Sequence, residues 1–281
     1  MDVMIDIIKD TLLDAVKILP FLWIAFFLIE LFEHKYSKKT IKMIENSGKV
    51  GPLLGGVLGC FPQCGFSVMA TNLYVTRIIT MGTLVSVYLS TSDEMLPILL
   101  SHGSSFSEVA KILGVKVGIA IVFGFLIDLL NHKKSKVDIH EICEEAGCHC
   151  ERGIFLSSLR HTVHTILFIM LVSFGLNLVM EFGGSKFLMG IFNQHSFLTP
   201  FLASLIGLIP NCAASVIITE LYLSGVLSFS SVIAGLLTGS GVALLVLFRT
   251  NKNLKENVKI LLLIYFIGVI SGLVLELFMI S

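Results

Sequence analysis

Long apolar segments alternate with shorter polar segments along the whole chain, and their order occurs twice. Apolar segments cover residues 12–32, 50–90 and 109–130, and then 166–180, 200–240 and the stretch that ends at 280. A membrane-spanning helix needs about 20 predominantly apolar residues, which most of these segments can supply. The pattern therefore predicts an all-α, polytopic membrane protein built from two similar halves.

One motif appears in both halves and defines how they correspond. Residues 54–74 read LGGVLGCFPQCGFSVMATNLY and residues 202–222 read LASLIGLIPNCAASVIITELY, and the two align without a gap at an offset of 148. The identical pairs include Pro62/Pro210 and Cys64/Cys212. A repeat of this length is half a protein rather than a short solenoid unit. Apolar halves that proline and glycine interrupt at the same point are typical of transporters whose binding site lies between two repeats.

Composition supports insertion into a membrane and argues against nucleic acid as a partner. Hydrophobic residues make up 55% of the 281 residues and charged residues only 14%, whereas a soluble domain carries about 25% charged residues. Such a chain cannot cover itself with polar surface, so we expect the lipid bilayer to be its main partner. Its formal net charge is zero, which is not the basic surface that nucleic-acid binding requires.

The charges of matched loops indicate that the two halves are inverted in the membrane. Loop 35–49 is rich in lysine, while its counterpart 183–199 contains only Lys186. Loop 92–110 is acidic, while its counterpart 240–258 is basic. Because cytoplasmic loops carry the excess of Lys and Arg, this reversal predicts opposite orientations for the two halves.

Opposite orientations require each half to cross the membrane an odd number of times. The segment 50–91 would reach about 63 Å as one helix, while three full crossings need about 60 residues. We therefore predict two half-length helices that meet near Pro62, then one full crossing, and five hydrophobic segments in each half. The predicted organisation is a first repeat at 1–131, a cytoplasmic linker at 132–153 and a second repeat at 154–281, with both termini outside.

The two proline breaks form the candidate substrate site. A break at membrane depth leaves backbone amides and carbonyls that must be buried in protein or line a wet cavity, and half-helix ends add partial charges. The candidate binding residues are Pro62, Gln63, Cys64, Ser67 and Thr71 in the first half, Pro210, Asn211, Cys212, Ser215 and Thr219 in the second, and Cys60 one turn from Cys64. Cysteine sulfur favours a soft metal or a trivalent metalloid, although a buried cysteine also acts as a small hydrophobic residue. The hydroxyl groups have the alternative role of satisfying backbone groups at a kink.

Two further features carry charge or metal ligands. Glu220 interrupts an apolar run, which makes it a candidate for a coupling proton or a cation, with a place near a helix end as the alternative. The linker contains His140, Cys143, Cys148, His149 and Cys150. This density favours a bound metal ion, although the spacing fits no standard zinc finger and a solvated loop is the alternative. We expect that transport requires no cofactor.

Together these features predict a secondary transporter for a metal or metalloid rather than an enzyme. The chain contains no glycine-rich Lys-Ser/Thr loop for nucleotide phosphates, so coupling would come from an ion gradient or a partner. Two other functions stay open: a membrane-embedded thiol enzyme with Cys64 or Cys212 as nucleophile, and a metal sensor or partner subunit that uses the linker. The first lacks a histidine near the breaks, and the second would not need duplicated breaks. A homo-oligomer also stays open.

Several motifs resemble those of the bacterial ten-helix heavy-metal exporters. They are CFPQCGFS, GLIPNCAASVIITELY, the LFEHK after the first span, the Cys/His-rich linker, and the ending AGLLTGSGVALLVLFRTNKNLKEN. The resemblance extends over nearly the whole chain. It implies a multi-pass protein of the bacterial plasma membrane, with Pro62, Cys64, Pro210, Asn211 and Cys212 as key positions. Members of that family carry two labels, arsenic efflux and manganese transport, and these substrates differ because arsenite favours sulfur ligands and manganese favours oxygen.

Labelling of single cysteines tests the inverted arrangement. With a membrane-impermeant maleimide, a Lys38→Cys variant should react only from the cytoplasmic side and a Lys186→Cys variant only from outside, because the lysine-rich loop stays inside. Reaction of both variants from the same side would contradict inversion.

Overall fold

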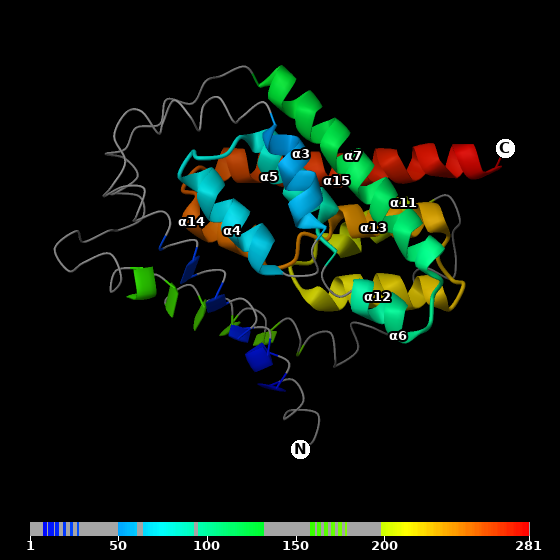
Figure 1. Cartoon of the computed structure of the whole chain (residues 1–281), viewed down its shortest axis with the longest axis horizontal. Helices are drawn as coiled ribbons and strands as arrows, with labels where there is room; N and C mark the ends of the chain where they lie inside the picture. The colour runs from blue at the N-terminus through cyan, green and yellow to red at the C-terminus, as the bar shows by residue number, and fades with distance from the viewer. Residues whose placement is uncertain are drawn as a thin grey trace.

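The computed structural model describes residues 50–60, 64–92, 95–131 and 198–280, with scattered residues between 8 and 27 and between 158 and 178. These described parts are helical and contain no strand, which confirms the all-α prediction for them (Figure 1). The first half contains α3 (Gly51–Gly59), α4 (Cys64–Val75), α5 (Met81–Ser90), α6 (Met95–Ser101) and α7 (Phe106–Leu130). The second contains α11 (Thr199–Gly207), α12 (Cys212–Leu223), α13 (Phe229–Thr238), α14 (Ala243–Thr250) and α15 (Leu254–Ile280).

The helix boundaries reproduce the offset found in the sequence. The helices that begin at residues 51, 64, 81, 95 and 106 have counterparts, 148 residues later, that begin at 199, 212, 229, 243 and 254. α3 and α11 have nine residues each, and α4 and α12 have twelve each. The repeat in the sequence is therefore also a repeat of helical structure.

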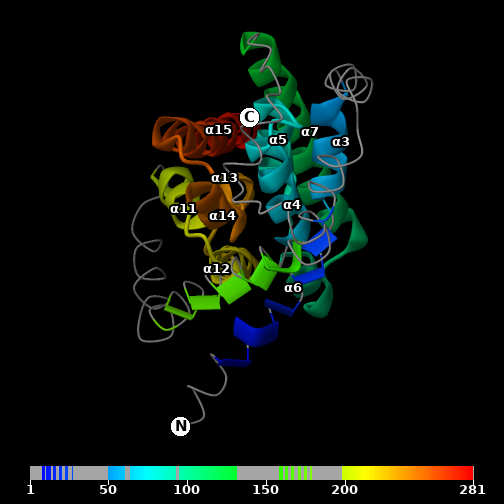
Figure 2. The same cartoon turned by 90° about the vertical axis from the view of Figure 1, so that its left-hand side faces the viewer.

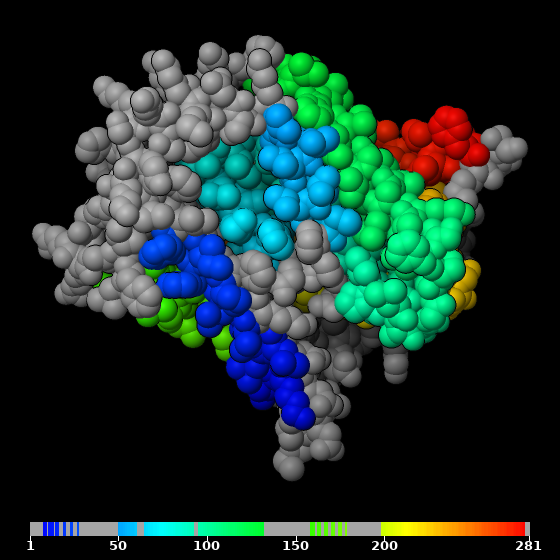
Figure 3. Space-filling view, in the orientation of Figure 1, coloured from blue at the N-terminus to red at the C-terminus, as the bar shows by residue number. Residues whose placement is uncertain are grey.

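Three described stretches are long and apolar enough to cross a membrane. They are α7, residues Leu254–Phe278 of α15, and the pair α13 and α14 taken together over Phe229–Thr250. In the most apolar part of each, only 28% of α7 and 39% of α15 is buried, against 83% of Phe229–Thr250. α7 and α15 therefore lie at the periphery, where Val122 and Phe266 are exposed, and Figure 3 shows α7 on the surface beside α3. This is a membrane protein whose outer helices present apolar side chains to lipid and whose core is a broken helix.

Each repeat packs three helices against one another at close distance. α3, α5 and α7 are in contact in the first repeat, and α11, α13 and α15 in the second (Figure 2). A Cβ atom added at Gly59 would lie 2.1 Å from Ser90 Oγ, and one added at the matched Gly207 would lie 2.1 Å from the Gly235 carbonyl oxygen. Small residues stabilise such contacts because helices in lipid associate mainly through van der Waals packing.

Contacts between the two repeats are reciprocal. α4 of the first repeat packs on α14 of the second, and α12 of the second packs on α6 of the first. The Tyr74 hydroxyl donates a hydrogen bond to Glu256, and the matched Tyr222 hydroxyl donates one to Glu108 at 2.7 Å. The two repeats therefore exchange contacts as the partners of a two-fold pair do.

Arg77 makes one of these two tyrosine–glutamate contacts stronger than the other. α4 and α12 end in the same turn, with Arg77 at φ 60° in the first and Gly225 at φ 76° in the second. In both turns the following amide donates to the carbonyl five residues earlier, which is a Schellman motif. A residue other than glycine costs about 1–2 kcal/mol in this conformation. Arg77 offsets that cost with two hydrogen bonds to Glu256, at 2.7 and 2.9 Å, whereas Gly225 brings no arginine to Glu108.

The structure corrects the prediction of loops at 92–110 and 240–258. α6 occupies much of the first and α14 much of the second, and α15 already begins at Leu254. The prediction is wrong because the charges near these segments masked two short apolar runs, MLPILLS and ALLVLFRT. The full crossing predicted for the second half is consequently a broken helix, α13 with α14, over Phe229–Thr250.

We predict that the Glu256→Gln variant loses more stability than Glu108→Gln. Glu256 accepts from the buried Tyr74 hydroxyl and pairs with Arg77, and hydrogen bonds to a charged group contribute about 1.5–3 kcal/mol. Among the described residues, Glu108 accepts one side-chain hydrogen bond, from the part-buried Tyr222 hydroxyl. The melting temperature of each purified variant in detergent measures the difference, and equal losses would contradict the asymmetry.

Candidate functional site

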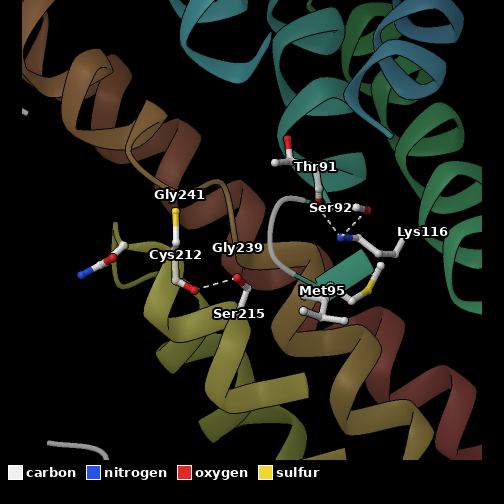
Figure 4. Close-up of a pocket in the computed structure, with 10 residues that line it drawn as sticks. Thr91, Ser92, Met95, Lys116, Cys212, Ser215, Gly239 and Gly241 are labelled. Atoms are coloured by element: carbon white, nitrogen blue, oxygen red, sulfur yellow. Dashed lines mark hydrogen bonds between the residues drawn. The ribbon is translucent and has the colours of Figure 1, made fainter. Parts of the chain in front are cut away.

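A pocket forms where three helix breaks come together. The breaks lie at residues 91–92 after α5, at 208–211 between α11 and α12, and at 239–242 between α13 and α14, and α7 closes one side (Figure 4). The lining residues are Thr91, Ser92, Met95, Lys116, Asn211, Cys212, Ser215, Leu236, Gly239 and Gly241. Both repeats thus contribute to a single pocket, with polar groups from each.

The second repeat contributes the N-terminus of α12. Asn211 has extended backbone angles and is the N-cap, and its Oδ1 accepts a hydrogen bond from the Ala213 amide at 3.3 Å. Cys212 is the first residue of the helix, and its side chain is 8% exposed. The helix end gives this side of the pocket a partial positive charge, and the thiol adds a soft ligand.

The predicted hydroxyl residues divide into two groups. The Thr71 and Thr219 hydroxyls each donate to the carbonyl of the residue four positions earlier, at 2.7 Å, and both side chains are buried outside the pocket lining. Their observed bonds match the alternative role at a kink. Ser215 also donates to a backbone carbonyl, that of Cys212 at 2.8 Å, but it lines the pocket. Ser67 is buried, and its carbonyl is the one that accepts from Thr71.

Lys116 is a pocket residue that the sequence reasoning missed. Its side chain extends from α7 and is 1% exposed, and its ammonium donates to the Thr91 carbonyl and to Ser92 Oγ, the latter at 3.3 Å (Figure 4). Thr91 is the C-cap of α5, so the cation lies at the negative end of that helix. The signal was present in the sequence, because a lysine inside the apolar segment 109–130 is a functional candidate by default.

Tyr88 occupies the position in the first repeat that Leu236 occupies in the second. Its hydroxyl lies 2.6 Å from Thr71 Oγ1 and donates to the Ala243 carbonyl at 3.3 Å, and the residue is fully buried. It joins α4, α5 and α14 by polar contacts. The two halves of the central region therefore differ in shape as well as in charge.

Glu220 and Cys60 are not among the described residues that line the pocket. The Glu220 side chain is 43% exposed and its carboxylate lies 3.9 Å from the His102 ring nitrogen, near the end of α12. This placement matches the helix-end alternative for Glu220. Cys60 is a half-buried C-cap of α3.

Other predicted positions lie outside the described residues. Pro62, Gln63 and linker residues 132–153 are among them, and of Cys64 only its place as the first residue of α4 is described. The described ranges contain no group of three or more His, Cys, Asp or Glu side chains placed to hold a metal ion. Pro210 is described, in the short turn between α11 and α12.

Comparison with known proteins gives one match. A family profile described as "Putative, 10TM heavy-metal exporter" matches residues 1–187 and 176–280, which together cover nearly the whole chain. No curated protein and no solved structure matched the chain. The helical fold and the membrane-spanning stretches of the described residues agree with the profile. The chain therefore belongs to the family that this profile describes.

Proposed function

We propose that this protein is a secondary transporter that exports a metalloid or a soft metal across the bacterial plasma membrane, with its substrate bound in the pocket between the helix breaks. One observation carries the proposal: breaks from both repeats meet at a pocket that combines a thiol, an amide, hydroxyls and helix ends. Non-helical backbone inside a membrane is tolerated where it lines a cavity, and transporters place their sites at such discontinuous helices.

The reciprocal contacts give the two-fold pairing that an inverted repeat requires. If the two-fold axis lies in the membrane plane, the Tyr74–Glu256 and Tyr222–Glu108 contacts lie on opposite sides of the bilayer. Each contact ties the half-helix of one repeat to the last helix of the other. Breaking one while the other holds would open the pocket to one side at a time, which is alternating access by movement of one repeat against the other.

The proposed binding chemistry combines sulfur with hydrogen bonding. Cys212 supplies the soft ligand, and Asn211 and Ser215 supply polar contacts from the same helix end. By the repeat, Pro62, Gln63, Cys64 and Ser67 have the corresponding role in the first half. A site that offers one or two thiols and helix ends binds a soft or trivalent centre better than a hard cation, because sulfur is a poor ligand for manganese.

We predict that Cys212→Ser and Cys64→Ser each lower the initial rate of arsenite uptake into everted membrane vesicles by about ten-fold or more, because serine oxygen replaces a soft ligand by a hard one. The matched control is Cys60→Ser, which changes a half-buried cysteine outside the pocket and should leave the rate within about two-fold of the unchanged protein.

Immunoblots of the vesicles establish that each variant is inserted in equal amount. Full arsenite transport by both Cys212→Ser and Cys64→Ser would remove sulfur ligation from the mechanism. Manganese transport that survives in both variants would then identify an oxygen-liganded cation as the substrate.

A further inference from the structure

Backbone carbonyls converge on the glycine that ends α13. A Cβ atom added at Gly239, the C-cap of α13, would have three carbonyl oxygens as its nearest neighbours, at 3.6, 3.7 and 3.9 Å: those of Leu236, Gly235 and Gly207. All three belong to the last four residues of α13 or α11, whose carbonyls lack an intrahelical partner. Two helix ends with partial negative charge therefore meet beside Gly239, which also lines the pocket (Figure 4).

Ser240 adds a hydroxyl directly after this glycine. Its side chain is fully buried, and its Oγ atom has no hydrogen-bond partner among the described residues. Its backbone amide donates to the Thr238 carbonyl at 2.9 Å, so only the side chain is left without a bond. Burial costs a hydroxyl its bonds to water, and a buried polar group without a partner is therefore rare. An ion held beside the Oγ atom would offset that cost.

The first repeat satisfies the matched helix end with donors from the chain itself. Thr91 has the position of Gly239, and its Oγ1 donates to the Val87 carbonyl at 2.7 Å. The Lys116 ammonium donates to the Thr91 carbonyl and to the hydroxyl of Ser92, the counterpart of the hydroxyl after Gly239. A hydroxyl and a cation thus reach the end of α5.

The second repeat keeps the packing of this helix end but not its donors. A Cβ atom added at Gly124 of α7, or at the matched Gly272 of α15, would lie 2.9 or 3.2 Å from a carbonyl oxygen at the start of α5 or α13. The two helix pairs therefore pack in the same register. Ile264 takes the place of the lysine, and Gly239 that of the threonine. Neither residue brings a hydroxyl or an ammonium group to the carbonyls.

We infer that a monovalent cation, Na⁺ or K⁺, binds at the end of α13, held by the carbonyls that converge on Gly239 and by Ser240 Oγ. Carbonyl oxygens can replace the hydration shell of an alkali cation, and transporters coordinate ions at the carboxyl ends of broken helices. The ammonium at the matched end of α5 carries a single positive charge. Residues 239–242 contain no carboxylate, the ligand that divalent cations usually take.

The position of this site beside the pocket gives the cation a role. Gly239 lines the pocket together with Asn211 and Cys212, so the cation and the substrate would bind next to each other. The cation is then the coupling ion of the exporter. This role rests on the proposed function, whereas the binding of the cation does not.

The melting temperature of the full-length protein in detergent tests the binding. NaCl and KCl are each titrated against choline chloride at constant ionic strength. At least one of them should raise the melting temperature in a saturable way, because a ligand that binds only the folded state stabilises it. In Gly239→Ala, the half-saturating concentration should rise by about ten-fold or more, because the Cβ atom fits between the carbonyl oxygens at ordinary contact distances and takes the place of the ion. Ser240→Ala should raise it as well, because one oxygen ligand is lost.

Two variants serve as matched controls. Gly118→Ala adds a Cβ atom at a glycine of α7 that has open space around it. Ser271→Ala removes another buried hydroxyl that has no partner among the described residues. Ser271 precedes Gly272, which packs on the opposite end of α13. Both controls should keep the half-saturating concentration of the unchanged protein, and size-exclusion profiles show whether each variant is folded.

Two results would overturn the cation site. One is a melting temperature that is the same in NaCl and KCl as in choline chloride, which would place a water molecule rather than an ion beside Ser240. The other is a half-saturating concentration that Gly239→Ala leaves unchanged.

Arsenite uptake into everted vesicles tests the coupling role separately. Vesicles loaded with the chloride of the bound cation and diluted into choline chloride should take up arsenite faster than vesicles loaded with choline chloride. A cation that raises the melting temperature but has no effect on uptake would overturn the coupling role alone. Absence of arsenite uptake with every cation would overturn the proposed function together with the coupling role, while cation binding in detergent would still stand.

Discussion

Backbone groups freed by a helix break inside a membrane must find partners within the protein, because lipid offers none. The described breaks meet this requirement with side chains that also form the pocket. The Thr91 carbonyl, at the end of α5, accepts from Lys116, and the N-terminus of α12 is capped by Asn211. The residues that make broken helices tolerable are thus the same residues that give the pocket its polarity. A substitution that removes one of them affects both the local backbone and the binding chemistry.

Contacts exchanged between the repeats hold both half-helices, α4 and α12. α4 contacts α14 and Glu256, and α12 contacts α6 and Glu108. Each half-helix is therefore held partly by the other repeat. Relative movement of the repeats must therefore move the walls of the pocket. In the proposed alternating access, opening at Glu256 would break its hydrogen bonds with Tyr74 and Arg77, whereas opening at Glu108 would break the one with Tyr222. The contact that includes Arg77 therefore has more hydrogen bonds than its counterpart at Glu108.

Much of this arrangement could be predicted from the sequence, because the repeat is strong in composition and in spacing. The offset of 148 anticipates the matched helix boundaries, and the motif around Pro210 anticipates the break that places Asn211 and Cys212 in the pocket. The second kind of break, at 91–92 and 239–242, carries no proline, and the charges that follow it in the sequence resemble those of a loop.

The positions of two ionisable side chains could not be predicted from the sequence pattern. Lys116 lies in a segment whose mean hydropathy is high, so the segment is predicted as apolar throughout. The partners of this buried cation come from the end of α5. Glu220 interrupts an apolar run in the same way, yet α12 ends just beyond it and leaves it 43% exposed. Only the length and packing of the helices decide which ionisable group in an apolar run reaches the pocket.

The central claim is that the substrate binds where the breaks of the two repeats meet. The most direct measurement is an experimental structure of the full-length protein with arsenite, using anomalous scattering at the arsenic absorption edge to locate the metalloid. The account predicts an arsenic peak within bonding distance of Cys212 Sγ, in the pocket lined by Asn211, Ser92 and Lys116. An empty pocket together with an arsenic peak elsewhere, in protein that transports arsenite, would contradict it.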